Sequence, residues 1–188
     1  MKTAIATLKS ASPYSPSRQH FTPKLERELN DAYEQRTWRE KGHYDPDGHL
    51  LIPPMMFKNA IAAAAQYMGM QVPGKGKSTY TKHFEAGVII PDAITLTQTR
   101  ENVESITLSQ NADGKRGSGT RVMRIFPIVN EWKGQLKILV LDDILTEDVV
   151  REHLIRTGQF IGIGRWRPRQ GGMNGRFEVE KFTWKDGL

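Results

Sequence analysis

The hydrophobic and polar positions change their period several times along the chain, and each change predicts a different element. Residues 3 to 9 alternate as a first strand, whereas residues 18 to 49 are charged and only weakly periodic, with one helix predicted near residues 24 to 39. Apolar residues at helical spacing, opened by two prolines, then predict a helix over residues 53 to 68. We therefore expect a strand, a long excursion over residues 10–49 and a helix.

The second half of the chain alternates strands with one further helix. Strand character over residues 86 to 96 is followed by two β-capable runs around a glycine-rich turn, which predict a protruding basic hairpin inserted at about residues 106–129. The run over residues 136 to 141 predicts the strongest strand, and its apolar residues on both faces suggest that both are buried. Thr146 begins a helix for which Gly158 is the predicted stop.

The predicted helix leads into a loop that combines glycine with arginine, from Gly158 to Glu180, and a strand starts near Phe177. Glycine allows positive φ and close approach to a ligand, and arginine carries planar, permanently charged donors that match phosphate oxygens. A solvated, flexible arginine loop has the same composition, but the position between a helix and a strand favours a polyanion site. The candidate nucleic-acid-binding residues here are Gly162, Gly164, Arg165, Trp166, Arg167, Arg169, Gly175 and Arg176.

The predicted elements follow the order strand, helix, strand, strand, helix, strand once the hairpin is counted as an insertion. This order approximates the ferredoxin-like α+β arrangement shared by RNA-recognition (RRM-like) folds. A chain of 188 residues with 38% hydrophobic residues can build one substantial core, so we expect a single domain over residues 1–188.

The charge of the chain adds further candidates. The formal net charge of +6 favours an acidic partner such as nucleic acid. Three segments that contain glycine are basic and free of acidic residues, namely residues 72–83, 114–130 and 158–176. We expect them to be loops that converge on one anion. This expectation adds five candidate binding residues: Lys75, Lys77, Lys115, Arg116 and Arg121.

Two local features leave alternatives open. Lys58 lies in the first turn of the helix predicted over residues 53–68, where the helix dipole disfavours a cation by about a few tenths of a kcal/mol. A phosphate held between its ammonium and the free N–H groups of that turn would reverse this effect, but an exposed lysine that tolerates its position fits as well. Tyr33 and Trp38 alternate with arginines, and either stack unpaired bases or hold the excursion to the core.

Several classes of protein are excluded or disfavoured. The chain has no cysteine, which excludes disulfides and thiolate zinc sites, and its five histidines do not fall at paired metal-ligand spacing. We therefore expect neither a metal nor a cofactor. No apolar run is long enough to span a bilayer, and the N-terminal run is too short for a signal peptide. A cytoplasmic protein without a membrane partner is the expectation.

Two segments resemble signatures of the RAMP superfamily of CRISPR proteins. Residues 47–61 are similar to its first-helix signature, with an aspartate-glycine turn at Asp47 and Gly48, an isoleucine-proline entry, and Lys58 in the opening helical turn. Residues 158–180 resemble its C-terminal glycine-rich loop, which ends in Gly-Arg-Phe before the last strand. The two signatures stand in the right order and cover a minority of the chain.

Within the superfamily, the similarity is greatest to the backbone subunits that polymerise along a guide RNA. The resemblance implies a ferredoxin-like core, a projecting hairpin thumb, and head-to-tail assembly in which each subunit binds a few nucleotides. It implies that Lys58 contacts the nucleic-acid backbone, and it places the thumb at residues 114–124 by position alone. The implied partners are single-stranded nucleic acid, RNA in particular, further copies of the chain, and other CRISPR-like subunits. The family's glycine and serines before the lysine are replaced here by Pro54, Met55 and Met56, which removes the hydroxyl groups of that turn.

Two alternative functions remain at this stage. Some members of the superfamily cleave RNA, with an aspartate before the first helix or with a histidine as general base. Asp31, Asp45 and Asp47 lie in the corresponding region, but no local motif singles out one of them, and His20 and His43 are in polar sequence without an identifiable partner. Asp31, His20 and His43 are the candidates for an endoribonuclease, and we expect no enzymatic activity. A protein-binding mimic of a CRISPR backbone subunit is disfavoured by the basic loops, because a mimic of nucleic acid is acidic.

Overall fold

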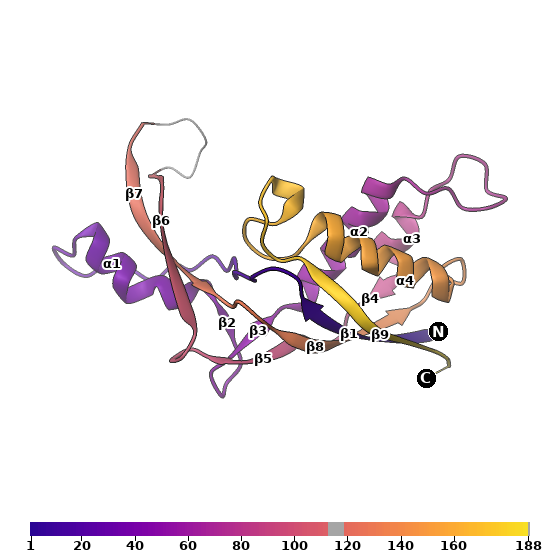
Figure 1. Cartoon of the computed structure of the whole chain (residues 1–188), viewed down its shortest axis with the longest axis horizontal. Coiled ribbons are helices and arrows are strands. Elements are labelled where there is room, and N and C mark those ends of the chain that lie inside the picture. Colours follow the sequence, from indigo (N-terminus) through magenta and orange to yellow (C-terminus); the bar gives the residue numbers. More distant parts are fainter. Residues whose placement is uncertain (113–118, 188) are drawn as a thin grey trace.

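The computed structural model describes residues 1–112 and 119–187 and has an α+β architecture built on antiparallel sheets (Figure 1). β1 (Lys2–Ser10) pairs on one edge with β8 (Lys133–Val140), from Lys2 opposite Val140 to Lys9 opposite Lys133, and on its other edge with β9 (Phe177–Asp186). The first and last strands of the chain are therefore neighbours. The main sheet has four strands in the order β4 (Val88–Ile89), β8 (Lys133–Val140), β1 (Lys2–Ser10) and β9 (Phe177–Asp186).

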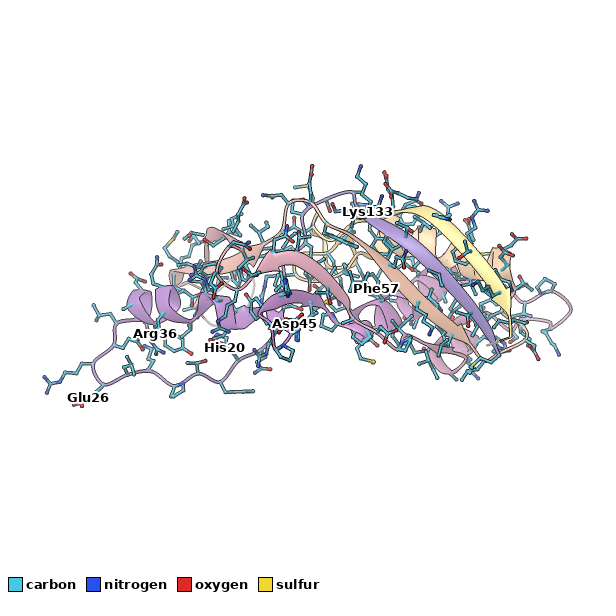
Figure 2. All side chains as sticks on the ribbon, turned by 90° about the horizontal axis from the view of Figure 1, so that it is seen from below. His20, Glu26, Arg36, Asp45, Phe57 and Lys133 are labelled. Carbon is cyan, nitrogen blue, oxygen red and sulfur yellow. The ribbon has the colours of Figure 1, made fainter. Side chains whose placement is uncertain are left out.

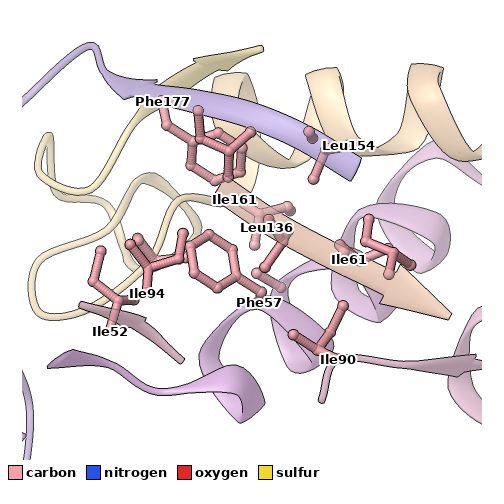
Figure 3. Close-up of a cluster of buried hydrophobic side chains, with 14 of the residues drawn as sticks. Ile52, Phe57, Ile61, Ile90, Ile94, Leu136, Leu154, Ile161 and Phe177 are labelled. Atoms are coloured by element: carbon pink, nitrogen blue, oxygen red, sulfur yellow. The ribbon is translucent and has the colours of Figure 1, made fainter. Parts of the chain in front are cut away.

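Two helices, α2 (Pro54–Met68) and α4 (Glu147–Arg156), pack on one face of this sheet (Figure 1). The small side chains of Ala4 and Ala6 on β1, and of Ala64 on α2, are buried and allow the helices to approach the sheet closely. Figure 3 shows the core between them, where larger side chains from both layers interlock. They include Phe57, Ile61, Leu136, Leu154, Ile161 and Phe177.

β8 buries only one of its faces. Leu136, Ile138 and Val140 are buried, whereas Leu139 is half-buried and Leu141, which follows the strand, is 48% exposed. The prediction that both faces are buried is therefore wrong, because α2 and α4 cover the sheet from one side only.

A second sheet and a hairpin extend the molecule away from this core (Figure 1). Between β2 (His43–Tyr44) and β3 (His49–Ile52), Gly48 has a φ of 85°, so the chain turns where the aspartate-glycine pair predicts. The predicted hairpin is present as a separate pair of strands, and its turn at residues 113–118 lies outside the described residues. The second sheet has the order β2 (His43–Tyr44), β3 (His49–Ile52) and β5 (Ile94–Thr99), and the hairpin consists of β6 (Glu104–Asn111) and β7 (Arg121–Ile128).

The excursion over residues 10–49 reaches one end of the molecule, where its helix lies beside the hairpin (Figure 1). It contains one α-helix, α1 (Asn30–Thr37), followed by a 3-10 turn, η1 (Trp38–Lys41). The helix starts later than predicted because Arg27 has a φ of 57°, which is outside the right-handed helical region. Figure 2 shows the segment around Glu26 as the far end of the molecule.

Candidate nucleic-acid interface

The glycine-rich loop connects α4 to β9, as predicted, and glycines with positive φ shape its backbone. α4 is followed by a wider π-type turn, η2 (Thr157–Ile161), which ends at Gly162, whose φ is 69°. Gly164 and Gly175 have φ values of 75° and 76°. A short 3-10 turn, η3 (Pro168–Gln170), forms the tip between them.

Gly158 lies two residues beyond the end of α4 at Arg156, close to the predicted stop, although the chain continues there as a π-type turn. It lies inside η2 and packs directly on β9, where a Cβ atom would lie 2.0 Å from the carbonyl oxygen of Phe177. Gly175 meets a similar demand, because a Cβ there would lie 1.8 Å from the carbonyl oxygen of Ile163, whose own N–H donates to the Gly175 carbonyl at 3.0 Å. These glycines fold the loop onto its neighbours, so it is a packed element and not a solvated coil.

An aromatic contact joins the loop to the hairpin. Trp166, which has a φ of 55°, packs edge-to-face against Phe126 of β7 with ring centroids 4.9 Å apart. The guanidinium of Arg165 lies 4.4 Å from the Phe126 centroid, and the ammonium of Lys41 lies 4.3 Å from the same ring. Burial lowers the pKa of Arg165, which nevertheless stays charged. Arg165 and Trp166 therefore fix the position of the loop, in addition to any contact with a ligand.

A buried charge network holds the excursion against the same hairpin. Glu34, only 4% exposed, accepts hydrogen bonds from the Lys41 ammonium, from Arg124 at 3.2 Å and from the Ile125 N–H at 3.0 Å. Burial alone would raise the pKa of Glu34, but the hydrogen bonds from Lys41 and Ile125 outweigh it and hold that pKa below its ordinary value. Nothing in the sequence identified Glu34 and Lys41, because the segment that contains them has the composition of a solvated surface.

An open groove of about 700 Å³ lies between α2 and the glycine loop. It separates the two segments that carry the resemblance, so the fold brings these distant parts of the sequence together. Ala62 and Ala63 have short side chains and keep the α2 wall low. The walls also include Met55, Asn59 and Gln66 of α2, Gly162, Gly164, Arg167 and Arg169 of the loop, and His43 and Glu85 from neighbouring segments.

None of the four arginines of the loop forms an ion pair with a carboxylate of the described residues, although the charge of Glu34 acts on Arg165 from a longer distance. Within the described ranges, no acidic oxygen lies within 4.0 Å of Arg165, Arg167, Arg169 or Arg176. Arg167 donates to the Gly164 carbonyl at 3.3 Å, and Arg169 donates to the Ala63 carbonyl at 3.3 Å. Backbone carbonyls orient these guanidinium groups without cancelling their charge, which leaves them suited to an anionic ligand.

Lys58 has protein partners in this structure. Its ammonium donates to the carbonyl oxygens of Phe84 and Glu85 at 2.6 and 2.7 Å, and burial lowers its pKa. These carbonyls belong to the end of α3 (Thr81–Ala86), a helix that the sequence did not predict. The partially negative carbonyl oxygens therefore compensate the charge of the Lys58 ammonium in the first turn of α2. They take the place of the phosphate that the sequence suggests as its partner. A contact of Lys58 with nucleic acid remains a prediction.

The three basic segments do not all converge on one point. Residues 114–130 and 158–176 meet where Trp166 packs on Phe126. Figure 1 shows the loop after α2, which carries Lys75 and Lys77, at the opposite end of the molecule from the β6–β7 hairpin, with the glycine loop between them.

Arg121 on β7 is held by Ser109 of β6, and Lys115 and Arg116 lie outside the described residues. The expectation that all three segments meet at one anion is therefore wrong, because residues 72–83 follow α2 and lie at the other end of the long axis.

The aromatic residues of the excursion serve its packing. Trp38 is only 6% exposed, and Arg39 covers its ring at 4.2 Å. Tyr33 is half-buried and donates a hydrogen bond to the Thr22 carbonyl at 2.7 Å. Of the two alternatives for these aromatics, the structure favours attachment of the excursion.

The three candidates for catalysis lie in different surroundings. His20 is near Thr22, at 3.2 Å, and burial lowers its pKa and that of His43. His43 lines the groove, whereas Asp31 is exposed on α1. No contact in the described part of the chain joins any two of these three residues.

Residues 1–112 and 119–187 contain no group of three or more His, Asp or Glu side chains that could hold a metal ion. No helix in these residues is long and apolar enough to cross a membrane.

No protein-family model matches the chain, and no curated protein matches it. Among solved structures, it is similar to a chain described as a CRISPR RNA-guided surveillance complex, with a TM-score of 0.42 and 10% sequence identity. The similarity covers 97% of this chain and 68% of that chain. A TM-score and an identity this low support no assignment of function, which therefore depends on the geometry described above.

Proposed function

We propose that the protein binds single-stranded nucleic acid, RNA in particular, and assembles along it in the manner of a RAMP backbone subunit. The observation that carries this proposal is the groove between α2 and the glycine loop. Arg167 and Arg169 line the groove, and neither guanidinium group forms an ion pair with a carboxylate of the described residues. Glu85 is the acidic residue in the lining, so the positive charges of the two arginines exceed the negative charge there. A permanently charged, planar donor beside an open groove suits a phosphate backbone.

The topology supports the finer assignment of the fold. The main sheet has the order β9-β1-β8-β4, with α2 between β1 and β4 in the chain and α4 between β8 and β9. A ferredoxin-like core has this order of strands and helices. In this assignment the β6–β7 hairpin is the inserted thumb, and the excursion is a second insertion.

The arrangement of the basic segments favours an extended ligand. The hairpin, the glycine loop and the loop after α2 follow one another along the long axis of the molecule (Figure 1). A compact anion cannot reach all three, whereas a nucleic-acid strand can pass along them. Arg121, Lys75 and Lys77 are the proposed backbone contacts at the two ends, together with the thumb residues Lys115 and Arg116.

Exposed apolar residues favour assembly with a second copy. Phe21, Leu25 and Leu29 are 85%, 61% and 77% exposed on the excursion, at one end of an elongated molecule (Figure 2). Isolated apolar residues on a surface are ordinary, but three within nine positions indicate a contact surface. Head-to-tail assembly would cover this end with the next subunit.

The test is the salt dependence of binding to a short fluorescent oligouridylate, measured by anisotropy. Each phosphate that a cation neutralises contributes about 0.7 to the slope of log K against log salt for a single strand. The double variant Arg167→Ala/Arg169→Ala should therefore bind more weakly, with a slope smaller by about 1.4. Arg151→Ala is the matched control, because Arg151 is an exposed arginine on α4 that does not line the groove. Equal affinity and slope for the wild type and the double variant would refute the proposal, and a DNA oligonucleotide of the same sequence tests the preference for RNA.

A further inference from the structure

An exposed pair of aromatic rings lies beside the groove, on the far side of Arg169. Tyr67, near the end of α2, and Phe160, in η2, pack with ring centroids 5.6 Å apart and an angle of 32° between their planes. Both side chains remain accessible, at 65% and 43% exposure. Two segments distant in sequence thus place an aromatic pair at the surface, where the core gains little from it.

A hollow of about 540 Å³ opens between this pair and the glycine loop. Its volume lies within the range of roughly 300–1,000 Å³ typical of sites for small ligands. Arg169 and Arg176 line it beside the two rings, and Pro168 forms part of its wall. Neither arginine is paired with a carboxylate of the described residues, so the hollow is both aromatic and positively charged.

The hollow adjoins the groove, because the two share lining residues. Arg169 and Gln66 line both, and the Arg169 guanidinium donates to the Gln66 side-chain oxygen at 3.2 Å. This hydrogen-bonded pair forms the boundary between them. A nucleic-acid strand that follows the groove can therefore pass over the Arg169–Gln66 pair and reach Tyr67 and Phe160 without leaving the surface of the glycine loop.

We propose that the hollow is a nucleobase subsite, in which a base of the bound strand stacks on the outer face of Tyr67 or Phe160 while Arg169 or Arg176 meets the adjoining phosphate. The two rings already contact each other, so the base lies on one of them and not between them. Stacking of this kind tolerates any sequence, because every base has a π face. The inference rests on the proposed function and names a further contact with the same ligand.

The positive charge around the rings decides between a nucleic acid and a protein partner. Arg156 lies 6.0 Å from the Phe160 centroid, which places a third guanidinium near the patch, although Glu152 pairs with it at 2.7 Å. An apolar protein segment would cover the rings but leave Arg169 and Arg176 facing it without a negative partner. A nucleotide matches both the rings and the arginines, since the face of its base is apolar and its phosphate is anionic.

The experiment compares the wild type with the double variant Tyr67→Ala/Phe160→Ala, using a short fluorescent oligoadenylate and an oligonucleotide of equal length with abasic spacers. The variant should bind the oligoadenylate about fivefold to hundredfold more weakly, while its affinity for the abasic strand is unchanged. Tyr67→Phe/Phe160→Tyr, which keeps both rings, should restore binding. Leu141→Ala is the control for loss of an exposed apolar side chain, and circular dichroism confirms that each variant is folded.

A second readout reports stacking directly. An oligonucleotide that contains 2-aminopurine should lose fluorescence on binding to the wild type and less on binding to the Ala variant. Equal affinity of the wild type and the Ala variant for the oligoadenylate would overturn the subsite while leaving the proposed function intact. Loss of self-association in the Ala variant, with nucleic-acid binding unchanged, would also overturn it and assign the patch to a protein contact. A wild type that binds no oligonucleotide would refute the proposed function itself.

Discussion

Replacing Glu34 should loosen the junction between the excursion and the hairpin. Its carboxylate is 4% exposed and accepts hydrogen bonds from Lys41, Arg124 and the Ile125 N–H. In Glu34→Ala the Lys41 ammonium and the Ile125 N–H stay buried without this partner. Removing one member of a buried ion pair typically costs about 3–5 kcal/mol, because the remaining charge is uncompensated. Glu34→Gln retains one carbonyl oxygen and should cost less, about 1–3 kcal/mol.

Urea unfolding followed by circular dichroism measures the free energy of unfolding of each variant. Glu26→Gln is the matched control, since Glu26 lies on the same excursion with its side chain 91% exposed and should leave the free energy of unfolding unchanged. The reasoning is refuted if Glu34→Ala and Glu26→Gln unfold at the same urea concentration with the same slope. A lower free energy of unfolding in Glu34→Ala should be accompanied by faster proteolysis of the excursion, since the network attaches the excursion to β7.

Two further predictions concern pH and close packing. The pKa of Glu34 is lower in the folded protein than its ordinary value of 4.5, so the stabilisation it provides is fully present above pH 4.5 and is lost as the pH falls through the folded pKa. The free energy of unfolding should therefore fall more steeply below pH 4.5 in the wild type than in Glu34→Gln, and equal slopes would contradict this. Gly158→Ala should lower the melting temperature because its Cβ would meet the Phe177 carbonyl at 2.0 Å, whereas Gly119→Ala, with nothing within 4 Å, should not. Thermal melts that coincide for these two variants would show that η2 can move away from β9.

The spacing of apolar residues predicted the helix and the strand that each bury a regular row of apolar side chains. The helix over residues 53–68 and the strand over residues 136–141 were found because their apolar residues repeat at the spacing that packing on a sheet demands. The glycine loop has a local signal as well, since positive φ at Gly162 and Gly175 favours a residue without a side chain. Its position between a helix and a strand follows from the same local signals.

The features that sequence could not supply depend on contacts between distant segments. Glu34 meets Arg124 across 90 positions, and Lys58 meets the end of α3 across 26. A solvated charge and a buried one look alike in sequence, so neither pairing leaves a local pattern. The separation of the basic segments was missed for the same reason, because composition reports charge but not where the fold places it. The aromatic pair of Tyr67 and Phe160 joins α2 to η2, and no periodic signal links them.

The measurement that tests the proposed function most directly is purification of the protein without nuclease treatment, followed by its absorbance ratio, its mass by size exclusion, and sequencing of any nucleic acid that accompanies it. A backbone-like protein should emerge as a particle larger than a monomer that contains RNA, and Arg167→Ala/Arg169→Ala should reduce both the RNA and the mass. A monomer free of nucleic acid that also fails to bind added RNA or single-stranded DNA at low salt would contradict the proposal.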